Sequence, residues 1–224
     1  MSERFNEIGM GLPAAWYDRE CRRCERLAGF LDEVSARHEG YFCGPVPPFG
    51  DGDAELLVVG LAPGMHGANA TGRPFTGDHA GLLLYQTLYK FGFASKPESL
   101  AADDDLVLHN CRITNAVKCL PPQNKPVGAE EKNCNPFLAS EISHPRVRII
   151  LALGQLAHRA ILRALGIRQS LHRFAHNALH DIGDGKLLVN SYHCSRYNTQ
   201  TRRLTTPMFE DVFEQISREI ENGR

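Results

Sequence analysis

Four of the seven cysteines have a spacing that could hold a metal. Cys21 and Cys24 form a C-x-x-C pair, and Cys119 and Cys134 form a second pair with two prolines between its members. Two such pairs can close four thiolates around a zinc ion or an iron–sulfur cluster. The residues alone leave both possibilities open, because four thiolates without a histidine suit either centre.

The other three cysteines, Cys43, Cys111 and Cys194, are expected to be ordinary small apolar residues. An odd number of cysteines in a chain without a secretory signal argues against a disulfide framework. The His-x-Glu and Pro-Cys-x-x-Cys elements of zinc deaminases do not occur in the sequence. A thioredoxin-like site would have its C-x-x-C directly after a strand, whereas this pair falls in a predicted helix.

A second set of chemistry-bearing residues lies at 60–78, directly after the apolar run 56–59, in a loop with five glycines and two prolines. Ligands of open parallel α/β sheets bind at the carboxyl ends of strands, where glycines let the backbone approach the ligand. The loop matches neither the P-loop nor the dinucleotide-binding pattern. Its Pro-Gly turn and Thr-Gly-Arg-Pro-Phe segment favour a flat, polar ligand, and Asp78 is placed to cap the helix that follows.

Alternating strands and helices must position these residues. Apolar runs predict strands at 56–60, 111–117, 147–153 and 187–192, and apolar periodicity predicts helices at 13–36, 81–91, 129–142, 155–165 and 208–220. The first helix would carry the C-x-x-C pair near its middle. This alternation argues for βαβ units and a buried parallel sheet, so the loops after the four strands should converge at one edge.

Length and charge narrow the classes of protein. A chain of 224 residues fits one domain, which we expect to span residues 1–224. The net charge of -1 argues against a generic polyelectrolyte binder, although a local basic face can coexist with it. No apolar run approaches the ~18 residues needed to span a bilayer, so we expect a soluble, cytoplasmic protein with no membrane contact.

Four motifs occur in a fixed order along the chain: Gly60-Leu61-Ala62-Pro63-Gly64, Thr-Gly-Arg-Pro-Phe-Thr-Gly-Asp at 71–78, Ile-Thr-Asn-Ala-Val-Lys-Cys-Leu-Pro-Pro at 113–122, and Ser-Tyr-His-Cys-Ser at 191–195. With these motifs the chain resembles the iron–sulfur uracil-DNA glycosylases, and most of all family 5, the type-B enzymes. The resemblance runs from Cys21 to about Thr205. Family 4 usually carries Glu in a Gly-Glu-x-Pro-Gly loop, whereas Leu61 and Ala62 are apolar, and the segment 66–69 also resembles the family 5 loop.

The resemblance implies a three-layer αβα fold with a central four-stranded parallel sheet. It also implies a 4Fe-4S cluster of structural role, held by Cys21, Cys24, Cys119 and Cys134. Two positions depart from the family pattern. Cys194 replaces the proline of the usual His-Pro-Ser motif, which removes a φ restraint from that loop, and Gly64 stands where family 5 often has Ala.

The same resemblance assigns roles around a flipped base, which must be stacked and read on its Watson–Crick edge. Phe75 is the expected stacking ring. The Asn115 amide can match N3–H and O4 of uracil as a donor and an acceptor. An N–H of His193 at O2 would stabilise the negative charge that grows on the departing base. Without the motifs, the three residues have simpler interpretations: Phe75 as a core residue, Asn115 as a turn residue and His193 as a structural histidine.

The position where many relatives carry Asp, Asn or Glu to position or activate the water is Ala62, which together with Gly64 and His66 is expected to line the base pocket. We expect Asn69 to hold the water, with His66 and Asp78 behind it, since an oxocarbenium-like transition state does not require a strong base.

Further side chains are expected to contact DNA phosphates, and Tyr197 could fill the gap left in the base stack. These are Arg73, Ser195, Arg196, Tyr197, Arg202 and Arg203.

We therefore expect a monofunctional, monomeric DNA repair glycosylase that acts on uracil, with hypoxanthine or xanthine as further substrates. Three alternatives stay open: a non-catalytic iron–sulfur or zinc nucleic-acid-binding protein, which Ala62 would favour, a family 4 type glycosylase, and a redox protein, which the cysteines alone would favour.

Overall fold

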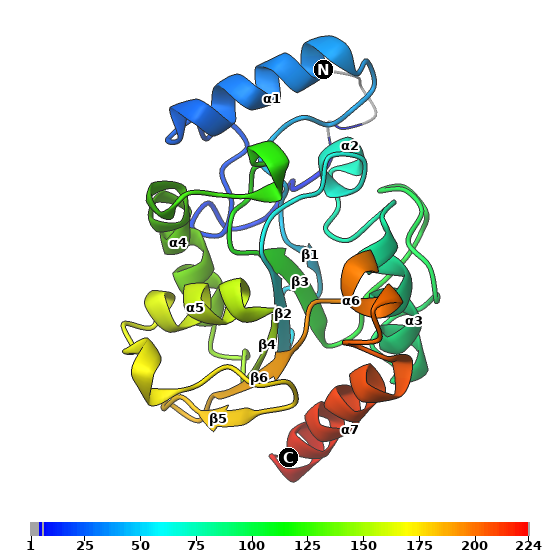
Figure 1. Cartoon of the computed structure of the whole chain (residues 1–224), viewed down its shortest axis with the longest axis vertical. Helices are drawn as coiled ribbons and strands as arrows, with labels where there is room; N and C mark the ends of the chain where they lie inside the picture. The colour runs from blue at the N-terminus through cyan, green and yellow to red at the C-terminus, as the bar shows by residue number, and fades with distance from the viewer. Residues whose placement is uncertain (1–4, 6, 224) are drawn as a thin grey trace.

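The structure is a computed structural model that describes residue 5 and residues 7–223. Its centre is a sheet with the strand order β1-β3-β2-β4-β6-β5 (Figure 1). The four inner strands are parallel to their neighbours, and the two edge strands pair antiparallel. The strands are β1 (Phe49–Gly50), β2 (Leu56–Gly60), β3 (Cys111–Asn115), β4 (Ile149–Leu153), β5 (Leu179–Asp181) and β6 (Leu187–Ser191).

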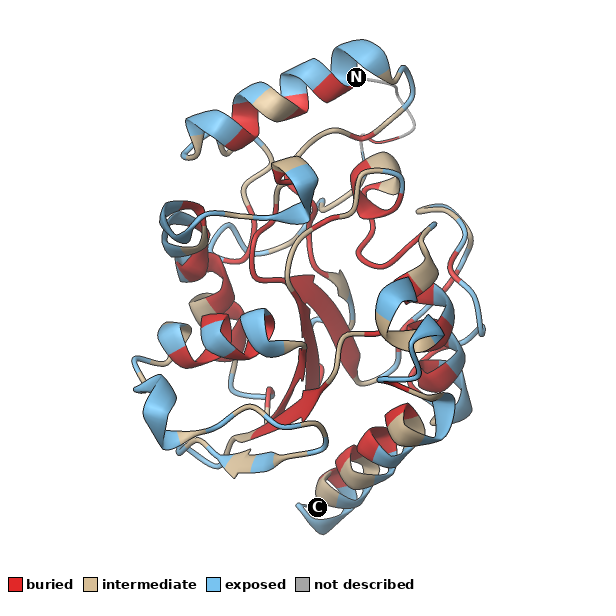
Figure 2. Ribbon diagram, viewed as in Figure 1, coloured by how far each residue is buried: buried red, intermediate tan, exposed pale blue. Residues whose placement is uncertain are grey.

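Helices cover both faces of the sheet (Figure 1). They are α1 (Glu25–Arg37), α2 (Ala68–Thr71), α3 (His79–Lys90), α4 (Gly128–Ile142), α5 (Gln155–Ala164), α6 (Arg196–Gln200) and α7 (Thr206–Asn222). Successive β2 residues point to opposite faces, so Leu56 and Val58 pack with α3 and α7, whereas Leu57 and Val59 pack with α4 and α5. The inner strands are buried along almost their whole length (Figure 2). These two cores confirm the predicted three-layer αβα fold around four parallel strands.

The structure differs from the predicted elements at its edges and near its beginning. The short antiparallel strands β1 and β5 were not predicted, because two or three residues are too few to show a period. Helix α1 begins at Glu25 rather than near residue 13, so Cys21 and Cys24 precede it and do not lie in its middle. No helix in the described part of the chain is long and apolar enough to cross a membrane.

The segment before α1 contacts a buried charged group through Trp16. The Trp16 ring packs on the Arg112 guanidinium at 4.0 Å, and it also meets His144 edge-on. Arg112 and Lys118 both face the Glu141 carboxylate, at 3.7 Å and 2.6 Å. Trp16 is therefore buried against the guanidinium of Arg112 on β3, and it does not lie on the apolar face of an amphipathic helix.

Candidate active site and cysteine site

A cavity of about 790 Å³ opens where the loops that follow the four parallel strands meet. It brings together six of the residues predicted for the site: Ala62, Gly64, Phe75, Asn115, His193 and Ser195. The helix-capping residue Asp78 and the predicted phosphate ligand Arg203 also line it. The convergence follows from the parallel order of the strands, as the sequence predicted.

Asn115 is the last residue of β3, and its side chain is buried. Its Oδ1 atom has no hydrogen-bond partner among the described residues. Leaving such an atom unpaired costs about 1 to 3 kcal/mol, so a ligand in the cavity that donated a hydrogen bond to it would be stabilised. Gly60 makes room for it, because a Cβ atom at Gly60 would lie 2.4 Å from this oxygen.

Phe75 forms a wall of the same cavity with a nearly fully buried ring. The ring also depends on Gly60, since a Cβ there would lie 2.7 Å from Phe75 Cζ. The backbone of Phe75 has φ of 54°, in the left-handed region that a residue with a bulky side chain seldom adopts. Neighbouring structure must therefore hold this residue in place.

His193 lies two residues beyond β6, and the exposed part of its ring lines the cavity. Desolvation by the surrounding protein lowers its pKa from 6.5 to about 4, so the imidazole is neutral at pH 7. The main chain is fixed by Asn198, whose Nδ2 donates to the His193 carbonyl oxygen at 2.8 Å. A neutral imidazole still carries one N–H that can donate to a ligand.

Asp78 caps α3 as predicted, because its Oδ1 accepts from the Gly81 N–H at 2.9 Å. Its carboxylate also lines the cavity, and burial raises its pKa. The other oxygen, Oδ2, faces the loop at 64–67, where a Cβ at Gly67 would lie 2.6 Å from it. Asp78 is thus an acidic group in the same cavity as the apolar Ala62.

The structure corrects the predicted places of Asn69 and His66, neither of which lines the cavity. Asn69 is fully buried, and its Nδ2 lies 3.6 Å from Cys43 Sγ. His66 is exposed, and its Nδ1 shares a hydrogen bond of 2.9 Å with the Tyr41 hydroxyl. The loop has no regular sequence pattern, so the sequence could not predict in which direction either side chain points.

The predicted phosphate contact of Arg73 is also corrected, because its side chain is buried. The guanidinium pairs with Asp104 at 2.5 Å and packs over the Phe49 ring at 4.2 Å. The remaining predicted DNA contacts do lie on one exposed segment, which contains α6. Ser195 caps that helix, Tyr197 is 70 % exposed, and Arg196, Arg202 and Arg203 are exposed.

Several residues of the cavity wall were not among the predicted site residues. Gly154 and Gln155 follow β4, and their position after a strand was a usable signal. Phe174 lies in an irregular segment and Asn124 ends a short 3-10 helix at Pro122–Asn124, and no sequence motif indicated either residue. Tyr192 stacks on His176 with ring centroids 5.0 Å apart, which holds this wall next to His193.

The four predicted metal-binding cysteines, Cys21, Cys24, Cys119 and Cys134, border one small cavity of about 20 Å³. They come from three places: the segment before α1, the loop after β3, and α4. Burial raises the pKa of the Cys119 thiol, and it raises that of Cys134 to about 11. Two donors approach the sulfurs: the Lys118 N–H lies 3.3 Å from Cys134 Sγ, and Asn133 Nδ2 lies 3.5 Å from Cys24 Sγ.

Among the described residues, no three His, Cys, Asp or Glu side chains are grouped closely enough to hold a metal ion. All seven cysteines are free thiols. Cys111 and Cys194 are buried in the core, as expected for small apolar residues.

The cavity and the cysteine site are neighbours. Ala62 lines the cavity and also packs against the apolar group around the four cysteines. Main-chain hydrogen bonds join the loops that carry the two sites, from the Ala116 N–H to the Gly60 oxygen and from the Val117 N–H to the Leu61 oxygen, each at 2.9 Å.

Comparison with known proteins gives one family. The family model for the uracil DNA glycosylase superfamily matches residues 47–217. A protein of Thermus thermophilus named Type-5 uracil-DNA glycosylase is 47 % identical over 88 % of this chain and 93 % of its own length. A Type-5 uracil-DNA glycosylase of Pyrobaculum aerophilum is 39 % identical over 92 % of this chain and 94 % of its own. A Type-4 uracil-DNA glycosylase of the same organism is 35 % identical, over only 55 % of this chain and 56 % of its own.

Proposed function

Because the chain belongs to the uracil DNA glycosylase superfamily, and within it to the type-5 family, we propose that it hydrolyses the N-glycosidic bond of uracil flipped out of DNA and leaves an abasic site. One observation carries this proposal: the unpartnered Asn115 Oδ1 and the Phe75 ring share one cavity. A buried amide beside an aromatic wall is the pair of contacts that a flipped pyrimidine needs.

Three side chains divide the recognition and the chemistry in this proposal. The base stacks on Phe75, and the Asn115 amide accepts from N3–H and donates to O4. His193 donates an N–H to O2 and stabilises the charge that develops there as the bond breaks. Its lowered pKa supports this role, because a neutral imidazole donates without a proton having to be taken up first.

We propose Asp78, in place of Asn69, as the group that holds the attacking water. Asp78 lines the cavity, whereas Asn69 is buried against Cys43. A carboxylate can accept a hydrogen bond from water and also stabilise the oxocarbenium-like sugar. Because the pKa of Asp78 is raised, its carboxyl group ionises at a higher pH than an ordinary aspartate does.

The exposed segment with α6 is proposed to hold the DNA through Ser195, Arg196, Arg202 and Arg203, with Tyr197 as the wedge that fills the vacated stack. We further propose that the protein acts as a monomer and that it also accepts hypoxanthine and xanthine.

We propose that Cys21, Cys24, Cys119 and Cys134 hold a 4Fe-4S cluster. The donor set fits, since Fe–S clusters are ligated by four thiolates. Four thiolates also suit a tetrahedral zinc ion, and the colour and metal content of the purified protein distinguish the two centres. A bound cluster would act as a cross-link between the segment before α1, the β3 loop and α4.

The proposed function is tested by incubating the purified protein with a uracil-containing oligonucleotide and cleaving abasic sites with alkali. Strand cleavage after alkali is expected for the wild type, and none for thymine or cytosine at the same position. A His193→Ala preparation, purified in the same way, controls for host enzymes. Binding to the oligonucleotide without an abasic product at any protein concentration would instead identify a non-catalytic binding protein. Hypoxanthine and xanthine oligonucleotides in defined pairs extend the same assay.

A further inference from the structure

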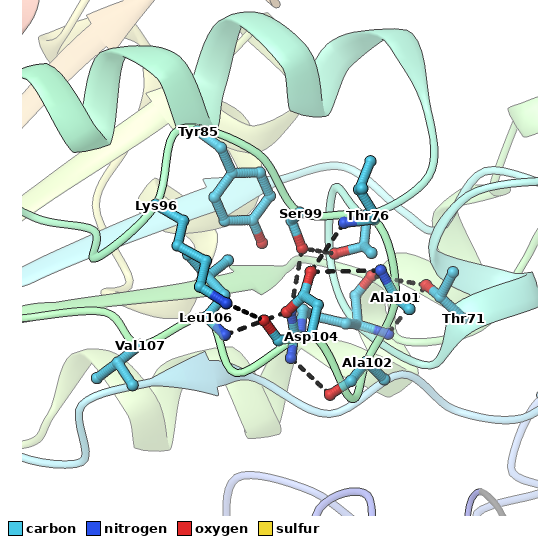
Figure 3. A network of polar contacts seen from close by, with 12 residues as sticks. Thr71, Thr76, Tyr85, Lys96, Ser99, Ala101, Ala102, Asp104, Leu106 and Val107 are labelled. Atoms are coloured by element: carbon cyan, nitrogen blue, oxygen red, sulfur yellow. Dashed lines mark hydrogen bonds and ion pairs between the residues drawn. The ribbon is translucent and has the colours of Figure 1, made fainter.

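Phe75 has to be held in a backbone conformation that its own side chain disfavours, and the residues on both sides of it are tied to neighbouring structure (Figure 3). The carbonyl oxygens of Pro74 and Phe75 face α3. The Tyr85 hydroxyl donates to the Pro74 oxygen at 2.9 Å, and Gly81 leaves room for the Phe75 oxygen, which would lie 1.9 Å from a Cβ at that position.

The other ties lead to the segment at 99–104. Arg73 Nη1 donates to Ser99 Oγ at 3.1 Å and to Asp104 Oδ1 at 2.5 Å, and Nη2 donates to the Ala102 oxygen at 2.5 Å. The Thr76 hydroxyl shares a hydrogen bond of 2.7 Å with Ser99 Oγ. Ser99 therefore bridges the residues two before and one after Phe75.

Asp104 organises the far side of this network (Figure 3). Besides Arg73, its carboxylate accepts from the main-chain N–H groups of Leu100 at 2.8 Å and of Leu106 at 3.2 Å. Burial is the largest single effect and raises the pKa of this carboxyl, but the hydrogen bonds from Arg73, Leu100 and Leu106 and the charge of Arg73 together outweigh it, so the pKa is lowered. At neutral pH the carboxylate is therefore ionised, and it accepts these hydrogen bonds as an anion.

None of Arg73, Ser99 and Asp104 lines the cavity that the described residues enclose. Any effect of these residues on a bound base must pass through a neighbour, and Phe75 is the cavity residue between Arg73 and Thr76. We propose that the Arg73–Asp104 pair, together with Ser99, which links Arg73 to Thr76, is a positioning device that fixes the Phe75 ring for stacking on the flipped base. This inference rests on the proposed function, because it presupposes that Phe75 is the stacking ring.

A double-mutant cycle tests this device, with Asp104→Asn made in the wild type and in Phe75→Ala. In the wild type, Asp104→Asn should lower kcat for uracil release on the order of 10-fold, with little change in KM, because a small misplacement of a positioned group is costly. In the Phe75→Ala background the same change should have no further effect. A loss of the same factor in both backgrounds, or no loss in the wild type, would overturn the proposal.

Glu33→Gln is the matched control, since it removes the exposed Glu33–Arg37 pair on α1, and it should leave kcat unchanged. If Asp104→Asn does not fold, Ser99→Ala enters the same cycle, because it removes only the bridging hydroxyl.

A second readout separates this inference from the proposed function. With a fluorinated phenylalanine at position 75, fluorine NMR should show a shifted or broadened resonance in Asp104→Asn and an unchanged one in Glu33→Gln. That result supports the positioning device even if the wild type releases no uracil, in which case only the proposed function fails. An identical resonance in both variants overturns the device.

Discussion

The rings of Phe75 and His193 lie with their centroids 6.0 Å apart and their planes tilted by 30°. This distance is within the range of direct aromatic contact, so no base fits between the two rings. Both residues line the cavity, so a base stacked on Phe75 would lie near His193. The arrangement suits a histidine that donates to a base oxygen.

Gly60→Ala is expected to abolish uracil release and also to lower the melting temperature, because overpacking at a buried position costs about 1 to 3 kcal/mol. The new Cβ would lie 2.4 Å from Asn115 Oδ1 and 2.7 Å from the Phe75 ring, so it would displace both contacts with the base. Single-turnover excision and thermal melting measure the two effects. Gly52→Ala is the matched control, because a Cβ there meets nothing within 4 Å, and an active Gly60→Ala would contradict the assigned pocket.

The lowered pKa of His193 predicts a pH-dependent stability. The unfolded chain binds a proton near pH 6.5 and the folded chain only near pH 4, so the contribution is fully present above pH 6.5 and is lost as the pH falls toward 4. Its size is roughly 2 to 3 kcal/mol after allowance for the partly exposed ring. Urea unfolding at several pH values should show this slope in the wild type and a shallower one in His193→Asn; equal slopes would refute the shift.

Asp78→Asn should slow uracil release on the order of 100-fold while the melting temperature stays the same, because asparagine caps a helix as well as aspartate does. The wild-type rate should fall as the pH drops through the raised pKa of Asp78, since the ionised form holds the water. The variant should lack this acid limb. Thr205→Asn is the matched control: it changes the N-cap of α7, away from the cavity, and should keep the wild-type rate and pH profile. If Asp78→Asn released uracil at the wild-type rate, a residue other than Asp78 would have to hold the water.

Cys119→Ser is expected to remove the brown colour of an iron–sulfur protein and to lower the melting temperature, since Cys119 is one of the four thiols that border the small cavity. Visible absorbance and iron analysis measure the loss. Cys43→Ser, away from that cavity, should keep the colour. A colourless wild-type protein that contains zinc would rule out the cluster.

Tyr197→Ala should reduce uracil release from double-stranded DNA more than from single-stranded DNA, because only a duplex leaves a gap that a wedge must fill. Tyr197 is 70 % exposed, which leaves its ring free for that contact. The ratio of the two rates is the quantity to measure. Tyr89, on α3, is also exposed, and Tyr89→Ala should leave the ratio at its wild-type value. An unchanged ratio in Tyr197→Ala would show that Tyr197 is not the wedge.

The sequence predicts the inner sheet and much of the cavity because both depend on local patterns. Continuous apolar runs marked the four parallel strands, and the residue after each run had to lie at one edge. Asn115, His193 and Phe75 were therefore predicted to lie together, and they do. The helix cap at Asp78 could be predicted for the same reason, and the hydrogen bond from the Gly81 N–H to Asp78 confirms it.

What the sequence could not predict depends on partners far along the chain. Arg73 is buried because Asp104, 31 residues away, pairs with it, and no local pattern announces that pair. Trp16 looked like part of a helix face, but it packs on Arg112. Asn69 was predicted from its neighbourhood in the loop, and only the contact with Cys43 shows its side chain turned away from the cavity.

The paired main chains of the loops after β2 and β3 have a consequence for how a lesion is found. Two hydrogen bonds, from the Ala116 and Val117 N–H groups to the Gly60 and Leu61 oxygens, extend the β2–β3 pairing into the bases of these loops and disfavour their separate movement there. We therefore expect the deformation needed for capture to fall on the duplex. Search would then be limited by how readily each base pair opens, and mispaired uracil, which opens more easily than paired uracil, would be removed first.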